Sequence, residues 1–265
     1  MDRRVLLDRL ASDEEDRLML AQFLDKSAQC RRSGIPTATA FLNPRQQTLA
    51  KTLANQTECT SYVFFGAYPE AERCTAIFLP DWAEPEQAEE YAPLQVLRAV
   101  WPAQAKVSLS HRDFLGALMA SGVRRDAVGD ILVRPDACDL IVLESIAPFL
   151  LDTFGSVGRT SIRVSRIAPD ELLLPQRKIR LIRDTVASLR LDAVAATGFS
   201  MSRERARELI RTGHTIVNNL PCEKPDRSIR EGDVISARGF GKFRVCAAGN
   251  LSRKGRIWVE IERFE

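Results

Sequence analysis

Apolar residues recur every three or four positions in two stretches near the start of the chain, residues 3–11 and 13–33. This spacing places them on one side of a helix, so it predicts two amphipathic helices. Gly34 and Pro36 follow the second stretch and indicate where that helix ends. Each helix has an apolar face that needs a partner to cover it.

A third helix is indicated by Asn43 as its N-cap, Pro44 at its first position and Gln46 three residues after the cap. Short apolar runs predict strands around it, at 38–42, 61–65 and 74–79. The stretch 80–93 is acidic and contains prolines, which is typical of a linker. Together these elements predict a small α+β domain over residues 1–85.

The next part of the chain gives a clearer order of elements. Strands are expected at 94–100, 129–133, 139–145 and 160–167, and helices at 111–122 and 146–155. The order β-α-β-β-α-β is that of the ferredoxin-like fold, which RRM domains share. RNA-reading RRM domains stack bases on aromatic residues of the central strands, whereas the third strand here, DLIVLES, has none. We therefore expect this domain, over residues 86–175, to have a structural or protein-contacting role.

A connector at 168–180 with two prolines leads to a third domain, over residues 181–265. Two helices are expected near its start, at 191–197 and 202–212. Beyond the helices, the pattern predicts strands at 214–218, within 230–245 and at 256–264, with turns at Asn218–Asn219 and Lys254–Gly255. The whole chain is thus predicted to be an α+β protein of three small domains.

The second of these helices carries a basic stripe. Ser202 is placed to cap it and Gly213 to end it. At about 100° per residue, Arg203, Arg207 and Arg211 fall side by side, next to the apolar stripe that faces the core. Guanidinium groups make bidentate contacts with phosphate, and the free N–H groups at a helix start add a second anion site. The helix therefore predicts a phosphate-binding surface.

Charge is distributed unevenly along the chain. The net charge is +3, but residues 1–100 carry −4, residues 101–175 carry −1 and residues 176–265 carry +8. A basic segment on an otherwise acidic chain favours a polyanionic partner, because neutralising phosphates dominates affinity for nucleic acids. The charge distribution therefore agrees with the basic stripe.

The remaining composition excludes several classes of protein. There are six scattered cysteines without a CxxC motif, and only two histidines. A disulfide framework, a metal site and a cofactor are therefore not expected, and a reducing cytoplasm fits best. No run of about 18 apolar residues is present, so no membrane span is expected. The first residues lack the apolar core of a signal peptide.

The third domain resembles a known RNA-binding family. The segment RLDAVAATGFSMSRERARELIRTGHTIVNN followed by EGDVIS is similar to the S4 domain of ribosomal protein S4. With HRDFLGALMASGVRRDAVGDILV (111–133), TVASLRLDAV (185–194) and ARGFGKF (237–243), the whole chain resembles the YlmH-like family. That resemblance implies a bacterial cytoplasmic protein that binds the large ribosomal subunit, contacts rRNA and peptidyl-tRNA, and rescues stalled subunits. Members have also been linked to cell-division genes. A monomer is expected.

The residues expected to contact RNA follow from the basic stripe and from this resemblance. Asp192 is expected to orient its neighbours rather than to bind RNA. Glycines beside the last three candidates allow an RNA backbone to approach the main chain. The candidates are Arg190, Ser202, Arg203, Arg207, Arg211, His214, Arg238, Lys242 and Arg244.

Catalysis is the alternative, because several enzymes carry S4 domains. A pseudouridine synthase needs an aspartate in an R-L-D context, but the R-L-D here, at 190–192, already belongs to the S4 pattern. A methyltransferase needs a glycine-rich nucleotide loop, which the sequence lacks. His111, Arg112 and Asp113 are the most enzyme-like cluster, but adjacent helical residues point about 100° apart. We therefore expect a non-enzymatic binder and keep an RNA-modifying enzyme as the second hypothesis.

Overall fold

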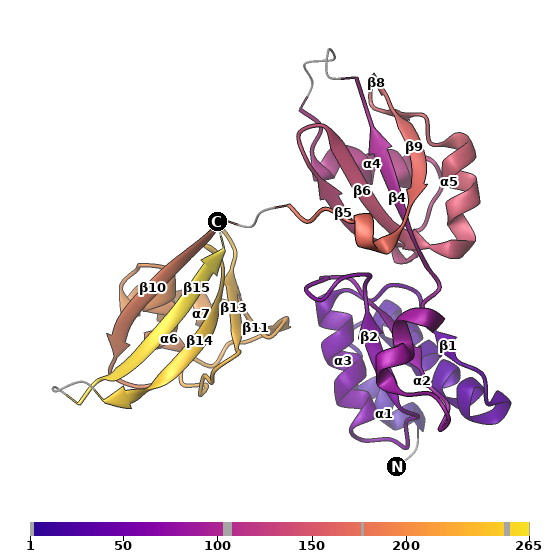
Figure 1. The fold of residues 1–265 in the computed structure, drawn as a ribbon. Helices are drawn as coiled ribbons and strands as arrows, with labels where there is room; N and C mark the ends of the chain where they lie inside the picture. The colour runs from indigo at the N-terminus through magenta and orange to yellow at the C-terminus, as the bar shows by residue number, and fades with distance from the viewer. Residues whose placement is uncertain (1–2, 103–107, 176–177, 252–254, 265) are drawn as a thin grey trace. The chain divides into compact units, whose positions relative to one another are not determined.

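The protein consists of two compact units in a computed structural model that describes residues 3–102, 108–175, 178–251 and 255–264. Unit 1 spans Met1–Pro175 and unit 2 spans Gln176–Glu265 (Figure 1). Unit 1 contains the first two predicted domains, and the boundary between them at residue 85 stays a prediction. Within the described residues, no helix has the length and apolar character needed to cross a membrane.

The first part of unit 1 packs three helices on a small antiparallel sheet of order β1-β3-β2. Its elements are α1 (Arg3–Leu10), α2 (Glu14–Ser33), β1 (Thr37–Ala38), α3 (Pro44–Ala54), β2 (Tyr62–Phe65) and β3 (Thr75–Phe78). The capping box of Asn43 and Gln46 is present, and α2 ends at Gly34 with φ of 63°. The predicted strand at 38–42 is mostly irregular. Residues 85–91 form a short 3₁₀ helix, η1 (Pro85–Tyr91), because Ala83 and Ala88 are buried in the core under it, so the stretch is not a linker.

The second part of unit 1 has the ferredoxin-like order of elements. Its four-stranded antiparallel sheet has the order β5-β6-β4-β9, and two helices cover one face of it. The elements are β4 (Leu94–Val100), α4 (His111–Ala120), β5 (Val128–Val133), β6 (Ala137–Leu143), α5 (Ala147–Thr153) and β9 (Arg163–Ile167). Phe114 and Leu118 of α4 and Leu150 of α5 pack on Leu97 and Leu140 of the central strands. The predicted fold is therefore confirmed for this part.

The other face of this sheet is covered as well. Phe41, from the loop before α3, packs with Leu132 and Ile141 of the sheet, and Tyr68 and Leu172 lie against the same cluster. RNA-reading RRM domains use this face for base stacking. Here the chain's own N-terminal part and the segment after β9 occupy it.

A buried carboxylate fixes the segment that follows β9. Asp139 accepts two hydrogen bonds from Arg98, at 2.7 and 2.8 Å, and one of 2.8 Å from Arg134. It also accepts from the amide of Leu173 at 3.2 Å, while Arg98 donates to the carbonyl of Glu171. Residues 171–173 are thereby held across the sheet.

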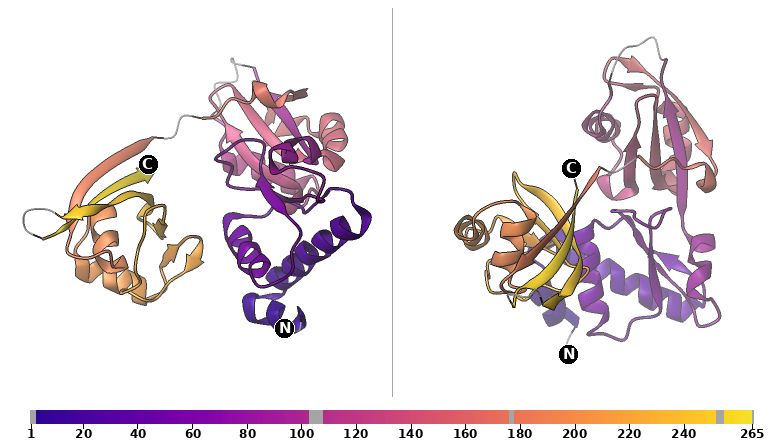
Figure 2. Two further views of the ribbon diagram at one scale, coloured as in Figure 1. Left: turned by 60° about the horizontal axis from the view of Figure 1, so that its bottom comes forward. Right: turned by 60° about the vertical axis from the view of Figure 1, so that its left-hand side comes forward.

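Unit 2 is a six-stranded antiparallel sheet of order β10-β15-β14-β13-β11-β12, with two helices on one face (Figures 1 and 2). Its elements are β10 (Ile179–Val186), α6 (Leu191–Gly198), α7 (Arg203–Arg211), β11 (Thr215–Val217), β12 (Leu220–Pro221), β13 (Val234–Ala237), β14 (Gly241–Leu251) and β15 (Ile257–Phe264). Asn218 and Asn219 form the predicted turn, with φ of 51° and 66°. Of the predicted turn Lys254–Gly255, Lys254 lies outside the described residues.

β10 was not predicted from the sequence. Residues 179 and 180 were assigned to the connector, but β10 begins at Ile179 and pairs with β15 along its whole length. Five of its first seven residues are exposed to solvent, so the strand lacks the apolar run by which buried strands are recognised.

Gly198 has a packing role at the end of α6. It is the last residue of α6 rather than a left-handed stop. A Cβ atom at this position would lie 2.4 Å from Cε1 of Phe243 on β14. Glycine is required there because α6 comes so close to the sheet.

Candidate nucleic-acid interface

Helix α7 places its arginines as the sequence predicts. Ser202 caps the helix by accepting a hydrogen bond of 3.2 Å from the amide of Arg205. The helix ends before Gly213, which has φ of 72°. Ala206 and Ile210 are buried against α6 and the sheet, so the opposite side of the helix faces solvent.

Three guanidinium groups converge on one carboxylate in the centre of this surface. Asp192, in the first turn of α6, is fully buried. Arg203 binds it in a bidentate manner, with Nε to Oδ2 at 3.0 Å and Nη2 to Oδ1 at 3.1 Å. Arg207 Nε donates to Oδ2 at 2.7 Å, and Arg190 Nε lies 3.5 Å from Oδ1. We call Asp192 with these three arginines the Asp192 cluster.

The Asp192 cluster fixes the arginines without neutralising them. The side chains of Arg190, Arg203 and Arg207 remain 45%, 41% and 44% exposed. Burial raises the pKa of Asp192, but the hydrogen bonds from Arg203 and Arg207 outweigh it and leave that pKa below its ordinary value. One ionised carboxylate therefore faces three permanent positive charges, and an exposed surface of net positive charge results.

Two of the remaining candidates lie at the end of α7. Arg211 is exposed in the last turn of the helix. His214 is also exposed, and its Nδ1 lies 2.8 Å from the hydroxyl of Thr212. The amide of Arg238 donates to the carbonyl of His214 at 3.2 Å, which brings Arg238 to the same end of the unit.

Lys242 and Arg244 lie on the other side of the sheet. Phe243 and Val245, which alternate with them along β14, are buried in the core beneath α6 and α7. Because successive residues of a strand point to opposite faces, Lys242 and Arg244 point away from the helices. Both cations lie over the ring of Phe264, at 5.6 and 5.9 Å from its centre. The candidates predicted from the sequence thus occupy two faces and do not form one surface.

Further charged and aromatic residues of unit 2, not predicted from the sequence, lie on these two faces. Arg205 of α7 lies over the ring of Phe240, at 5.6 Å. Arg183 of β10 and Trp258 of β15 share the outer face of the sheet with Lys242. The alternation of residues along 257–264 was the available signal, but it identifies a face only when the pairing with β10 is known.

Asp113, the aspartate of the enzyme-like cluster in unit 1, has a structural role. Asp113 accepts hydrogen bonds from the amide and hydroxyl of Ser110, at 2.8 and 2.6 Å, and so completes the capping box of α4. These two bonds lower the pKa of Asp113. Among the described residues, no group of three or more His, Cys, Asp or Glu side chains is placed to hold a metal ion.

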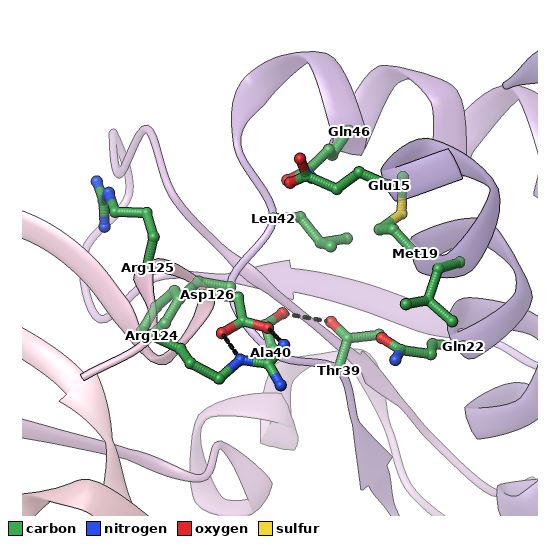
Figure 3. A pocket seen from close by; sticks show the side chains of 12 residues that line it. Glu15, Met19, Gln22, Thr39, Ala40, Leu42, Gln46, Arg124, Arg125 and Asp126 are labelled. Carbon is green, nitrogen blue, oxygen red and sulfur yellow. Dashed lines mark hydrogen bonds and ion pairs between the residues drawn. The ribbon is translucent and has the colours of Figure 1, made fainter. Parts of the chain in front are cut away.

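Unit 1 also contains a cavity of about 330 Å³ beside α2, shown in Figure 3. Several polar groups in its wall are bonded to protein. The Thr39 hydroxyl donates to the carbonyl of Ala40 and accepts from the amide of Ala76. Arg124 is ion-paired with Asp126, and Arg125 donates to the carbonyls of Val128 and Gly129.

Comparisons with known proteins agree with the two-unit structure. Residues 87–171 match the family model described as "Putative RNA-binding domain in YlmH", and residues 189–235 match the S4 domain. The chain is 34% identical over 225 residues to "Ribosome-associated protein quality control protein P2" of Bacillus subtilis (strain 168), covering 85% of this chain and 86% of that protein. It is 35% identical over 79 residues to small ribosomal subunit protein uS4 of Desulfotalea psychrophila, covering 28% of this chain and 38% of that protein.

Among solved structures, "Cell division protein ylmH from Streptococcus pneumoniae" is similar to 61% of this chain and 96% of that chain, with a TM-score of 0.49 and 23% identity. The B. subtilis protein is matched over most of its length and the two domain models lie in the expected order. The chain therefore belongs to the YlmH-like family of bacterial S4-domain RNA-binding proteins.

Proposed function

We propose that this protein binds structured RNA on the ribosome through the Asp192 cluster and acts there in quality control of translation. The observation that carries the proposal is the convergence of Arg190, Arg203 and Arg207 on Asp192, with every guanidinium still accessible. A fixed, net positive set of guanidiniums is suited to neighbouring phosphates of a folded RNA. Arg211 and the capped start of α7 extend this surface along the helix.

The relatives supply the cellular setting. The B. subtilis relative is named as a ribosome-associated quality control protein, and this chain matches most of it. We infer that this protein also associates with ribosomes in the cytoplasm, as a monomer. We further infer that its target is rRNA or peptidyl-tRNA on the large subunit, where stalled translation is rescued.

Unit 1 is proposed to have a structural or protein-contacting role rather than to read bases on its sheet. Phe41 and Leu172 already cover the sheet face that an RNA-reading RRM domain leaves open. Any RNA contact of this unit must therefore come from its edges or helices.

The direct test is the double variant Arg203→Ala, Arg207→Ala. Its affinity for large-subunit RNA is expected to fall at least tenfold, because two phosphate contacts are lost. The log–log slope of affinity against salt should become shallower by about 2. Arg163→Ala, Arg166→Ala on β9 is the matched control, since it removes the same charge from exposed positions of unit 1. Equal affinity of the two double variants would contradict the proposal.

The second candidate function is RNA modification by an active site outside the Asp192 cluster. Purified protein would be incubated with rRNA, with and without S-adenosylmethionine, and the nucleosides analysed by mass spectrometry. We expect no new nucleoside. Any modified nucleoside that depends on the protein would show that it is an enzyme and would contradict a purely binding function.

A further inference from the structure

A hollow of about 310 Å³ lies on the outer face of the sheet of unit 2, away from the Asp192 cluster. Trp258 of β15 forms one side of it and is 49% exposed. On the neighbouring strand, Gly249 lies directly opposite Trp258, and Ala247 lies opposite Glu260. The small residues of β14 therefore leave the indole without a covering side chain.

Two guanidiniums lie on the other side of Trp258. Thr185 of β10 pairs with Trp258, and Arg256 Nε donates to the hydroxyl of Thr185 at 2.8 Å. Arg183, two residues earlier on β10, lies in the wall of the hollow and is ion-paired with Glu260 at 2.7 Å. The site thus combines an open aromatic face, bare backbone and cationic groups at its rim.

These features fit a flat ring joined to an anionic backbone. We propose that the hollow receives one unpaired nucleobase of the bound RNA, stacked on Trp258, with the adjoining phosphate near Arg183 and Arg256. Aromatic side chains bind bases in this way without selecting a sequence, since every base has a π face. The Arg183–Glu260 ion pair presents donors and acceptors to the edge of the base. The proposal rests on the proposed function, because it requires unit 2 to bind RNA.

The charge of unit 2 favours a nucleic acid as the occupant. Residues 176–265 carry a net charge of +8. The two carboxylates in the wall are already engaged, because Glu260 is paired with Arg183 and Glu231 accepts a hydrogen bond of 2.8 Å from the amide of Ala248. The site would therefore hold an unpaired base beside the structured RNA, so we expect RNA with a single-stranded tail to bind more tightly than RNA without one.

Gly249 allows the hollow to be filled without disturbing the fold. A Cβ atom at this position meets nothing within 4 Å, and the residue is not in the left-handed region. Gly249→Val should therefore fold normally, since valine suits a strand, and its side chain would occupy the space of the base. Trp258→Ala leaves the hollow open but removes the aromatic ring on which the base would stack.

The experiment uses the full chain and two RNA hairpins, one blunt and one with a five-nucleotide single-stranded tail. The wild type should bind the tailed hairpin about tenfold more tightly, within the roughly 5- to 150-fold that stacking one base provides. Gly249→Val and Trp258→Ala should both lose this preference and keep the affinity for the blunt hairpin. Arg203→Ala, Arg207→Ala should weaken both hairpins and keep the preference.

A second readout follows the indole itself. Tailed RNA should quench the fluorescence of the wild type more than that of Trp258→Phe, because stacking on a base quenches tryptophan emission. If Gly249→Val and Trp258→Ala both kept the preference for the tailed hairpin, this proposal would be overturned. The proposed role of the Asp192 cluster in RNA binding would not be affected. Loss of large-subunit binding in Gly249→Val with unchanged binding of both hairpins would assign the hollow to a protein side chain and would also overturn it.

Discussion

Gly198 of α6 lies directly beneath the ring of Phe243, so that a Cβ atom on Gly198 would come within 2.7 Å of three ring carbons. Phe243 is fully buried, and its ring has no space into which it can move. This contact sets the distance between the helix that carries Asp192 and the sheet below it.

The first prediction follows from this contact. Gly198→Ala should lower the free energy of unfolding of unit 2 by about 1–3 kcal/mol, because it overpacks the core. Urea unfolding measures the change. The matched control is Gly116→Ala, in the middle of α4, where a Cβ atom meets nothing within 4 Å. That variant should be stabilised by about 0.5–1 kcal/mol. Equal effects at the two positions would contradict the close contact.

A second prediction concerns acid. The pKa of Asp192 is held below its ordinary value of 3.8, so its ionised form stabilises the folded state above about pH 4. This contribution should be lost as the pH falls through the lowered pKa. Asp192→Asn should be less stable than the wild type by about 1–3 kcal/mol at pH 7. The difference should shrink as the pH falls from about 4 through the lowered pKa, below which both folded proteins lack the charge.

Urea unfolding between pH 7 and pH 2, followed by the fluorescence of Trp258 in a background in which Trp82 and Trp101 are replaced by phenylalanine, would test this prediction. Asp16 and Asp139 also have lowered pKa values and destabilise the wild type in acid, so the quantity to compare is the difference between the two proteins. A difference that stays constant with pH would show that the ionisation of Asp192 is not involved.

The third prediction concerns the contribution of the N-cap of α7 to stability. Ser202→Ala removes the acceptor for the amide of Arg205 and should cost about 1 kcal/mol. It should also weaken RNA binding through fraying of the first turn, which carries Arg203. Ser200, just before the cap, has φ of 56°, so Ser200→Gly relieves strain and should be neutral or stabilising. Thermal unfolding should show a lowered midpoint for Ser202→Ala and an unchanged or raised midpoint for Ser200→Gly.

The fourth prediction tests the covered sheet of unit 1. Asp139→Ala leaves Arg98 and Arg134 without their buried partner, at sites where those side chains are only 20% and 15% exposed. We expect a loss of about 3–5 kcal/mol in the stability of unit 1. Hydrogen exchange at the amide of Leu173 should become faster, because residues 171–173 lose their attachment. Asp170→Ala, at an exposed position, should change stability by less than about 0.5 kcal/mol.

Local signals in the sequence were sufficient for much of the structure. Ser202, Gly213 and the spacing of the arginines define α7 without reference to the rest of the chain, and the order of elements in the second part of unit 1 follows from periodicity. Asp192 was expected to orient its neighbours, and in the structure it binds Arg190, Arg203 and Arg207 together.

What the sequence did not reveal depends on distant pairing. The ion pair of Arg183 and Glu260 joins residues 77 positions apart, so neither β10 nor the outer face of the sheet could be placed from local pattern. The position of Phe41 on the sheet of unit 1 likewise depends on contacts between residues far apart in the sequence. Lys242 and Arg244 differ, because their alternation with Phe243 and Val245 already indicated the opposite face.

The position of β15 between β10 and β14 has a consequence for how unit 2 comes into being. β10 is the first strand of the unit to be synthesised and β15 is the last, yet along its length β10 pairs with β15 alone among the described strands. During synthesis, β10 stays unpaired with its strand partner until β15 has left the translating ribosome. Unit 2 therefore completes its fold only as its own synthesis finishes.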